Sequence, residues 1–206
     1  MLIQIHPDNP DQRKLSQVVK VLQKGGVIVY PTDTVYALAC DINSKSAVEK
    51  ICQLRGIKPN KANFSIVCKD LSELTEFAKQ VNNSTFRLMK KALPGPYTFI
   101  LNASKKSPGI FRKSKKTIGI RIPNNNIALA IVESLGNPIM TASLKDNDDI
   151  VEYTTDPELI HENMANKVNL VIDGGFGQNA PSTIIDCSSG EPELIREGLG
   201  VVSLIF

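Results

Sequence analysis

The feature that most constrains the fold is a short apolar segment that stops at a proline and continues as polar residues. The segment Val27–Tyr30 is apolar and rich in β-branched residues, which is typical of an interior strand, and Pro31 ends it because proline has no N–H for the ladder. Thr32, Asp33 and Thr34 follow directly and form what we call the polar ledge. Ligands of open α/β sheets collect outside the carboxyl ends of strands. The ledge therefore indicates either a ligand site or an ordinary helix start, since Thr and Asp are also frequent N-cap residues.

The length and composition are those of a globular protein. The chain has 206 residues without a Pro/Gly/Ser-rich linker, which favours one domain, and 42% of its residues are hydrophobic and 22% charged. No apolar run reaches the roughly 18 residues that a membrane span needs, and Met1–Pro10 lacks the pattern of a signal peptide. The 4 cysteines are widely spaced in apolar surroundings and form no Cys-x-x-Cys pair. We therefore expect a cytoplasmic protein, with no membrane partner, whose thiols are buried and reduced.

Helix and strand signals are mixed along the whole chain. A first helix is expected to be capped by Asn9, with Pro10 in its first turn, and to end at Gly25-Gly26. The apolar patterns predict further helices at 45–54, 71–79, 84–91, 126–135 and 157–164, and strands at 27–30, 64–68, 97–101, 117–122, 139–142, 169–172, 183–187 and 194–196. Several strands are adjacent near the C-terminus. The sequence therefore predicts the α/β (α+β) class: a single domain over residues 1–206 with a twisted mixed sheet and flanking helices, rather than a strictly parallel doubly wound sheet.

Several common chemistries find little support in the sequence. His6 and His161 are the only histidines, and neither has a Cys, His or carboxylate at ligand spacing, so no metal site is predicted. The same scarcity of histidine argues against a Ser-His-Asp or Cys-His mechanism, and no catalytic nucleophile is assigned. The glycine-rich stretch 174–177 matches neither the dinucleotide nor the P-loop pattern, and we expect it to be a turn.

Cations and hydroxyls recur at or near the predicted strand ends. Arginine can hold a carboxylate or a phosphate through two parallel hydrogen bonds, and hydroxyls can complete the hydrogen bonding of the anion. Each position alone is more often structural, but their joint placement favours an anion-binding site. The residues concerned are Arg55, Lys58, Lys61, Arg121, Thr141, Ser143, Ser182, Thr183 and Arg196.

A second basic feature lies between Lys105 and Arg121, where the chain carries no acidic residue. Such a stretch suits a phosphate-bearing partner, although an ordinary solvated loop is the alternative. Only 5% of the residues are aromatic and none is tryptophan, so any RNA would be bound through shape and charge rather than through base stacking. The candidate RNA-binding residues are Lys105, Lys106, Lys113, Lys115 and Lys116.

A set of short motifs makes the chain resemble the YrdC/YciO family over nearly its whole length. The motifs follow the order and spacing of that family: YPTDTVYAL at 30–38, PGPYT at 94–98, IGIRIP at 118–123, PIMTAS at 138–143, STIID at 182–186 and IREG at 195–198. The resemblance implies a YrdC-like fold, a twisted mixed α/β sheet with a concave, positively charged face. It also implies the activity of the family's best-known members, the L-threonylcarbamoyladenylate synthases. These join L-threonine, bicarbonate and ATP, with magnesium, into threonylcarbamoyl-AMP and pyrophosphate for the threonylcarbamoyladenosine modification of tRNA, and members are also described as binding double-stranded RNA.

The resemblance carries residue roles with it. Matched by motif position, the residues expected to contact threonine are Thr32, Arg121, Thr141 and Ser182. The residues expected on the ATP side are Arg55, Lys58, Ser143, Lys145 and Arg196. A threonyl carbamate must be held in line with the α-phosphate of ATP, so positioning and charge neutralisation do most of the work and no side-chain nucleophile is required.

Some motifs depart from the synthase pattern. The synthases carry Lys-x-Arg-Pro where this chain reads RGIKP at 55–59, and Ser-x-Asn where it reads Ser143-Leu144-Lys145; a histidine found in many synthases is absent from the stretch Val67-Cys68. These differences are similar to the YciO-type branch. The sequence leaves two hypotheses open, a synthase-like enzyme or a nucleotide- and double-stranded-RNA-binding protein of the same fold without synthase activity. Convergence of Arg55, Lys58 and Lys145 on one triphosphate would favour the enzyme.

Overall fold

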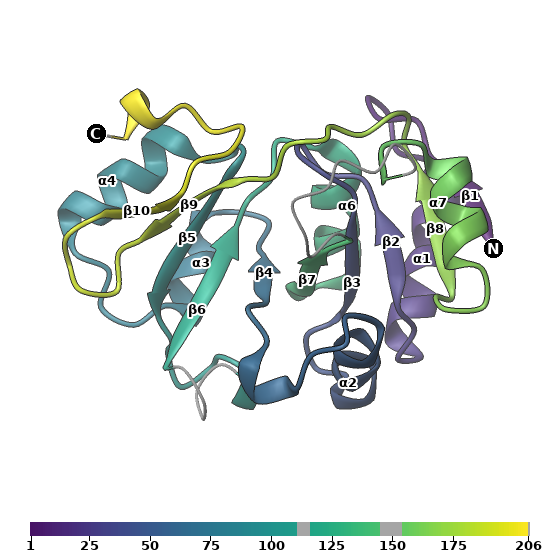
Figure 1. The fold of residues 1–206 in the computed structure, drawn as a ribbon, viewed down its shortest axis with the longest axis horizontal. Helices are drawn as coiled ribbons and strands as arrows, with labels where there is room; N and C mark the ends of the chain where they lie inside the picture. The colour runs from purple at the N-terminus through teal and green to yellow at the C-terminus, as the bar shows by residue number, and fades with distance from the viewer. Residues whose placement is uncertain (111–115, 145–153, 206) are drawn as a thin grey trace.

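All the strands of the computed structural model belong to one mixed sheet, whose topology confirms the predicted fold class (Figure 1). The structure describes residues 1–110, 116–144 and 154–205. The sheet has 10 strands in the order β1-β8-β2-β3-β7-β4-β6-β5-β9-β10, with both parallel and antiparallel neighbours. The strands are β1 (Leu2–Gln4), β2 (Ile28–Tyr30), β3 (Ala37–Asp41), β4 (Ser65–Val67), β5 (Tyr97–Asn102), β6 (Thr117–Arg121), β7 (Ile139–Ser143), β8 (Leu170–Asp173), β9 (Thr183–Asp186) and β10 (Glu193–Arg196).

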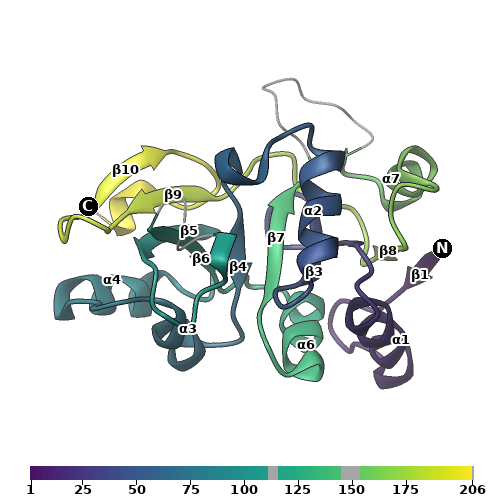
Figure 2. The ribbon, with the colours of Figure 1, turned by 90° about the horizontal axis from the view of Figure 1, so that it is seen from below.

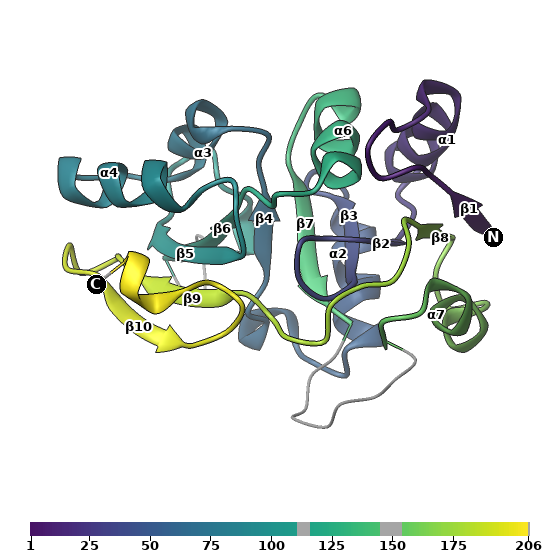
Figure 3. The same cartoon turned by 90° about the horizontal axis from the view of Figure 1, so that it is seen from above.

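Helices lie on both sides of the sheet. Seen along its edge, α1, α3, α4 and α6 lie on one side, and α2 and α7 lie on the other (Figures 2 and 3). No helix in the described ranges is long and apolar enough to cross a membrane. The helices are α1 (Gln12–Gln23), α2 (Lys45–Leu54), α3 (Leu71–Phe77), α4 (Asn83–Ala92), α6 (Asn126–Leu135) and α7 (Pro157–Met164), with short 3₁₀ turns η1 (Pro59–Lys61) and η3 (Val202–Leu204).

The first helix begins later than the sequence pattern predicts. Its N-cap is Asp11, whose carboxylate accepts hydrogen bonds from the N–H groups of Arg13 at 2.8 Å and Lys14 at 3.1 Å. The prediction of Asn9 as the cap is therefore wrong. A charged acceptor at Asp11 satisfies these N–H groups and also meets the positive end of the helix dipole, which a neutral Asn9 could not do.

Two strands were not predicted, and one of them changes the interpretation of the polar ledge. β3 pairs antiparallel with β2, Ala37 lying opposite Tyr30, so the ledge connects two neighbouring strands and is not a helix start. The sequence ALACD of β3 is built from small apolar residues of weak strand propensity, and β1 has only 3 residues. β3 is fixed by pairing with β2 and β7 inside the sheet, and the edge strand β1 by pairing with β8, rather than by their own sequences.

The core fills the space on both faces of the sheet. The stripe of α1 predicted from its spacing, Leu15, Val18, Val19 and Leu22, is buried. The cysteines are free and buried, as expected. Burial raises the pKa of the Cys40 thiol to about 12, so this side chain behaves as a small neutral hydrophobe.

Candidate functional site

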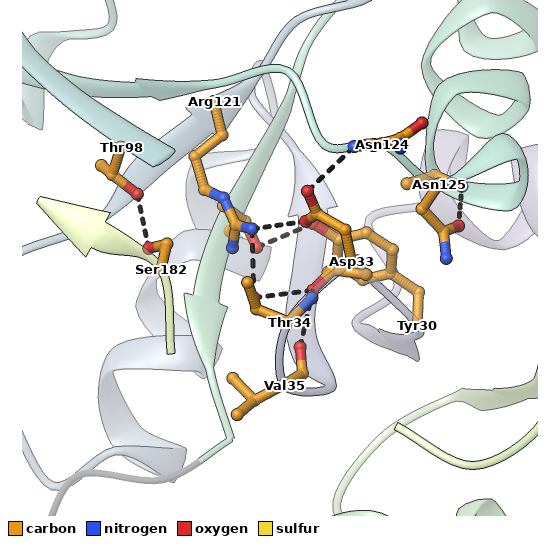
Figure 4. A network of polar contacts seen from close by, with 12 residues as sticks. Tyr30, Asp33, Thr34, Val35, Thr98, Arg121, Asn124, Asn125 and Ser182 are labelled. Carbon is orange, nitrogen blue, oxygen red and sulfur yellow. Dashed lines mark hydrogen bonds and ion pairs between the residues drawn. The ribbon is translucent and has the colours of Figure 1, made fainter. Parts of the chain in front are cut away.

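The polar ledge folds back onto Arg121 through a buried ion pair. Nη2 of Arg121 donates to Oδ1 of Asp33 at 2.8 Å, and the two side chains are only 9% and 8% exposed (Figure 4). Oδ2 of Asp33 accepts a hydrogen bond from the backbone N–H of Asn124 at 3.0 Å, one residue before the N-cap of α6. Asp33 therefore ties the β2–β3 connection to the segment between β6 and α6.

Arg121 keeps a spare hydrogen-bond donor in this arrangement. Its Nη2 also donates to Oγ1 of Thr34 at 3.1 Å, so both hydrogens of that nitrogen are used. Its Nε is buried and has no hydrogen-bond partner within the described ranges. A buried unsatisfied donor costs about 1–3 kcal/mol, which a ligand oxygen at this position would recover.

A directed chain of hydroxyls runs from Arg121 through the ledge. The hydroxyl of Thr32 donates to the carbonyl of Val35 at 2.8 Å, and its Oγ1 lies 3.0 Å from Oγ1 of Thr34. Because the single hydrogen of Thr32 is used, the hydroxyl of Thr34 must donate to Thr32, which leaves its oxygen free to accept from Arg121. Thr32 therefore belongs to the same hydrogen-bonded cluster as Arg121, where its contacts are all within the ledge, and its contact with threonine stays a prediction.

Thr141 joins this cluster from the middle of the sheet. Its Oγ1 lies 2.9 Å from the phenol oxygen of Tyr30, and burial raises the pKa of that phenol to about 12, so Tyr30 is neutral. The strand predicted at 139–142, with Thr141 and Ser143 at its end, is one residue too short, and Thr141 lies inside β7. β7 continues to Ser143 because its whole length is paired with β3, and Ser143 is the residue at the strand end.

Ser182, directly before β9, and Arg196, at the end of β10, lie next to the cluster. Oγ of Ser182 lies 2.8 Å from Oγ1 of Thr98 (Figure 4), and Nη2 of Arg196 donates to the carbonyl of Ser182 at 2.8 Å. Partial desolvation, and next the positive charge of Arg121, lower the pKa of the Arg196 guanidinium. Two guanidinium groups whose positive charges repel each other create a positive potential that favours binding of an anion.

The remaining ATP-side residues lie elsewhere in the topology. Arg55 is the C-cap of α2, and burial lowers its pKa; Lys58 is exposed at the N-cap of η1, ahead of β4. Arg121 ends β6, which runs parallel to β4, whereas Lys58 comes before β4 begins. The two residues therefore lie toward opposite ends of this pair of strands. Lys145 lies outside the described residues. That Arg55, Lys58 and Lys145 share one phosphate group therefore stays a prediction.

The basic stretch is only partly described. Lys105 and Lys116 are exposed, whereas Nζ of Lys106 forms an ion pair with Oε2 of Glu76 at 2.8 Å. Lys113 and Lys115 lie outside the described residues. The partial neutralisation of Lys106 is a feature that the absence of acids between 105 and 121 could not reveal, because Glu76 comes from α3. RNA binding through this stretch stays a prediction.

The glycine-rich stretch 174–177 packs against both ends of the connection that contains the ledge. The phenol of Tyr36 donates to the carbonyl of Gly175 at 2.7 Å and accepts from the N–H of Gly174 at 3.2 Å. A Cβ on Gly174 would lie 2.7 Å from side-chain atoms of both Pro31 and Ile127. Glycine at this position therefore allows the segment after β8 to pack closely against the start of the ledge.

Two cavities in the described structure lie away from this cluster. One, of about 200 Å³, is lined by the α3–α4 connection and residues 187–190; the other, of about 390 Å³, lies between α3 and the α6–β7 turn. We place the candidate site at Arg121 because buried charge and an unsatisfied donor indicate ligand chemistry more directly than cavity volume does.

Taken together, the mixed sheet and the arginine–hydroxyl cluster define a class of α/β protein suited to holding a small anionic ligand. A family model that covers Sua5, YciO and YrdC proteins, described as "Telomere recombination", matches residues 20–198. This chain therefore belongs to the Sua5/YciO/YrdC family.

Individual relatives place it within that family. The chain is 46% identical to the uncharacterized protein YciO of Escherichia coli K12 over 200 residues, 96% of this chain and 95% of that protein. It superposes on the crystal structure of E. coli YciO with a TM-score of 0.92, at 44% identity and covering 100% and 99% of the two chains. It is also similar to Pyrococcus abyssi Sua5 complexed with L-threonine, with a TM-score of 0.86 at 26% identity, covering 96% of this chain and 57% of that one. A threonylcarbamoyl-AMP synthase of P. abyssi is 28% identical over 91% of this chain and 55% of that protein.

Proposed function

We propose that this protein binds L-threonine at the Arg121 cluster and forms threonylcarbamoyl-AMP from L-threonine, bicarbonate and ATP for tRNA modification. The observation that carries the proposal is the buried guanidinium of Arg121, whose Nη2 donates to Asp33 and Thr34 while its Nε is left unsatisfied. The similarity to a Sua5 structure complexed with L-threonine supports it.

On the threonine side, the carboxylate of the amino acid would accept from Arg121. A charged acceptor at a buried guanidinium forms the strongest type of hydrogen bond available in this cluster. Thr141 and Ser182 each engage one neighbouring hydroxyl, and each of these two oxygens has a further lone pair for a ligand N–H or O–H. The Thr32 oxygen already accepts from the hydroxyl and the backbone N–H of Thr34, so Thr32 would hold the ledge in shape around the ligand. The amino acid would thus be fixed in orientation before it reacts.

On the ATP side, Arg196, which donates to Ser182, and Ser143, two residues beyond Thr141 on β7, would border the threonine side, and Arg55, Lys58 and Lys145 would neutralise the phosphates. Magnesium would enter with ATP and help to neutralise the triphosphate. Both oxygens of Asp33 already accept hydrogen bonds from Arg121 and Asn124, so the ion would be held mainly by the phosphates.

The proposed reaction needs no covalent enzyme intermediate. The amine of threonine combines with bicarbonate to give a carbamate and water. A carbamate oxygen then attacks the α-phosphorus of ATP, and the bond from that phosphorus to the bridging oxygen breaks to release pyrophosphate. The protein's contribution is to align the two substrates and to neutralise charge on the phosphates.

The direct test is to incubate the protein with ATP, labelled bicarbonate, L-threonine and magnesium, and to look for labelled threonylcarbamoyl-AMP. The expected result is formation of that product together with an equal amount of pyrophosphate, both requiring L-threonine. Pyrophosphate that appears without threonine would indicate a different adenylating reaction, and the absence of product from a protein that binds ATP would contradict the synthase function.

Replacing Arg55 and Lys58 together by alanine should abolish ATP binding, because both charges are proposed to neutralise the triphosphate. The melting temperature should change little, because the exposed Lys58 contributes little to stability and the half-buried Arg55 carries a desolvation cost that its removal relieves. Calorimetric titration with ATP and magnesium measures the first effect, and thermal unfolding measures the second. The matched control replaces Lys90 and Lys91, exposed cations of α4, by alanine. Equal ATP affinity in both double variants would show that Arg55 and Lys58 are ordinary surface charge.

The second candidate function is nucleotide and double-stranded-RNA binding without synthase activity. The 46% identity to the uncharacterized YciO, against 28% to a named synthase, sets this chain apart from the named synthases, and the exposed Lys105 and Lys116 offer charge for RNA phosphates. If lysines such as Lys105 and Lys116 contact phosphates, affinity for duplex RNA should fall steeply with salt, with a log–log slope of roughly −0.7 to −0.9 per phosphate neutralised. Titrations at two salt concentrations measure the slope. Affinity that is independent of salt, or that survives Lys105→Ala with Lys116→Ala, would contradict RNA binding by this stretch.

A further inference from the structure

Ser65 differs from the other hydroxyl residues around Arg121. The hydroxyls of Tyr30 and Thr141 are bonded to each other, and those of Thr98 and Ser182 form a second pair. Ser65, half-buried at the start of β4, has no hydrogen-bond partner for its hydroxyl in the part of the chain that the structure describes. Its Oγ is therefore available as both donor and acceptor.

The strand register places Ser65 next to the threonine-side residues. It lies directly opposite Thr141 of β7 and directly opposite Gly119 of β6. Residues paired in this way project to the same face of a sheet, with Cβ atoms about 4.5–5.5 Å apart in an antiparallel pair. Arg121 is two residues beyond Gly119 on β6 and therefore shares that face. Ser65 thus lies between Thr141 and the strand that carries Arg121.

Gly119 makes room for the Ser65 hydroxyl. A Cβ on Gly119 would lie 2.5 Å from Oγ of Ser65 and 3.4 Å from Cγ2 of Thr98. No real side chain tolerates the first of these distances. The Ser65 hydroxyl consequently reaches over the backbone of β6 into space that any other residue at position 119 would fill.

We propose that Ser65 is a specificity-determining residue, whose hydroxyl forms a hydrogen bond with the side-chain hydroxyl of a bound hydroxy-amino acid. This inference rests on the proposed binding of threonine. The ligand carboxylate goes to Arg121, because the charge-assisted bond is the stronger one, and the neutral Ser65 is left for the neutral group. A ligand with a methyl group at that position would bury the Ser65 hydroxyl without a partner, so L-threonine is preferred over its isostere L-valine.

The test is a calorimetric comparison of L-threonine and L-valine on the wild type, Ser65→Ala and Ser65→Thr. Ser65→Ala should weaken L-threonine binding by about three- to tenfold, as expected for one neutral hydrogen bond. Its affinity for L-valine should stay the same or rise, so that discrimination between the two ligands shrinks. Ser65→Thr keeps the hydroxyl and should retain the preference. The matched control is Ser72→Ala, an exposed serine of α3, and thermal unfolding checks that each variant is folded.

The possible outcomes separate this inference from the function on which it rests. Wild-type protein that binds L-threonine, with unchanged discrimination in Ser65→Ala, overturns the role of Ser65 and leaves the threonine site intact. An equal loss for both ligands also overturns it, since Ser65 would then contact a group that both share. Wild-type protein that binds no L-threonine overturns both. Should Ser65→Ala unfold, Gly119→Ala displaces the same hydroxyl and is expected to lower the same discrimination.

Discussion

Replacing Arg121 with alanine is expected to have the largest effect of any single change in the site. Asp33, whose side chain is 8% exposed, would be left as a buried carboxylate without its counter-ion. Removing one partner of a buried ion pair costs about 3–5 kcal/mol of stability. Threonine binding should weaken by about 2–4 kcal/mol, the range for truncating one partner of a desolvated charge pair. Urea unfolding and calorimetry with L-threonine measure the two effects.

A double variant separates the charge effect from the binding effect. Arg121→Met combined with Asp33→Asn removes both charges while keeping similar volumes, so it should recover part of the lost stability but none of the threonine affinity. Undiminished threonine affinity in a folded Arg121→Ala protein would remove Arg121 from the site. An unchanged free energy of unfolding would show that water reaches Asp33 when Arg121 is shortened.

Replacing Gly198 with alanine is expected to have the second largest effect. The added Cβ would overlap the carbonyl oxygen of Pro181 and lie 2.7 Å from the carbonyl carbon of Ser182. Both atoms belong to the backbone and cannot rotate away, so the segment after β10 has to move. That movement breaks the 2.9 Å bond from the N–H of Gly198 to Thr183 and displaces Arg196 from Ser182. The expected cost is about 1–3 kcal/mol of stability, typical of overpacking, together with weaker ATP binding.

Thermal unfolding and calorimetric titration with ATP and magnesium measure these effects of Gly198→Ala. The matched control is Gly109→Ala, since a Cβ on Gly109 would meet nothing within 4 Å. If Gly198→Ala melts and binds ATP as the control does, the contact between the segment after β10 and Ser182 does not support the site.

Much of the fold could be predicted because its elements carry strong local patterns. The apolar stripe of α1 and the apolar strands β5 and β6 have the periodicities that helices and strands require. β3 could not be predicted, because its small apolar residues have weak strand propensity and adopt this conformation through pairing with β2 and β7. The position of the Asp11 cap was missed for a different reason. Asn9 and Asp11 are both acceptable cap residues, and the choice depends on where the chain enters the helix.

Some residues of the candidate site could likewise be predicted from the sequence, and others could not. Motif positions identify Arg121 and Thr141 as residues of interest, and the structure brings both into one cluster with the ledge. The partner of Arg121 could not be predicted, since Asp33 lies 88 positions away and neither residue has a local pattern that indicates the other. Ser65 was missed because a lone serine in an apolar strand resembles many others. Its position becomes informative only when the register places it opposite Gly119 and Thr141.

The interleaved strand order has a practical consequence for anyone who wishes to divide this chain. The N-terminal strand β1 pairs with β8, and β5 pairs with β9, so early and late segments alternate across the sheet. The site contains residues from Tyr30 to Arg196. Within it, the Asp33–Arg121 ion pair joins two residues that are 88 positions apart in the sequence. A split protein or a chimera with a relative would therefore have to preserve contacts from both parts at once. Crossover points between Asp33 and Arg121 keep the buried ion pair only where both parents supply the matching charge.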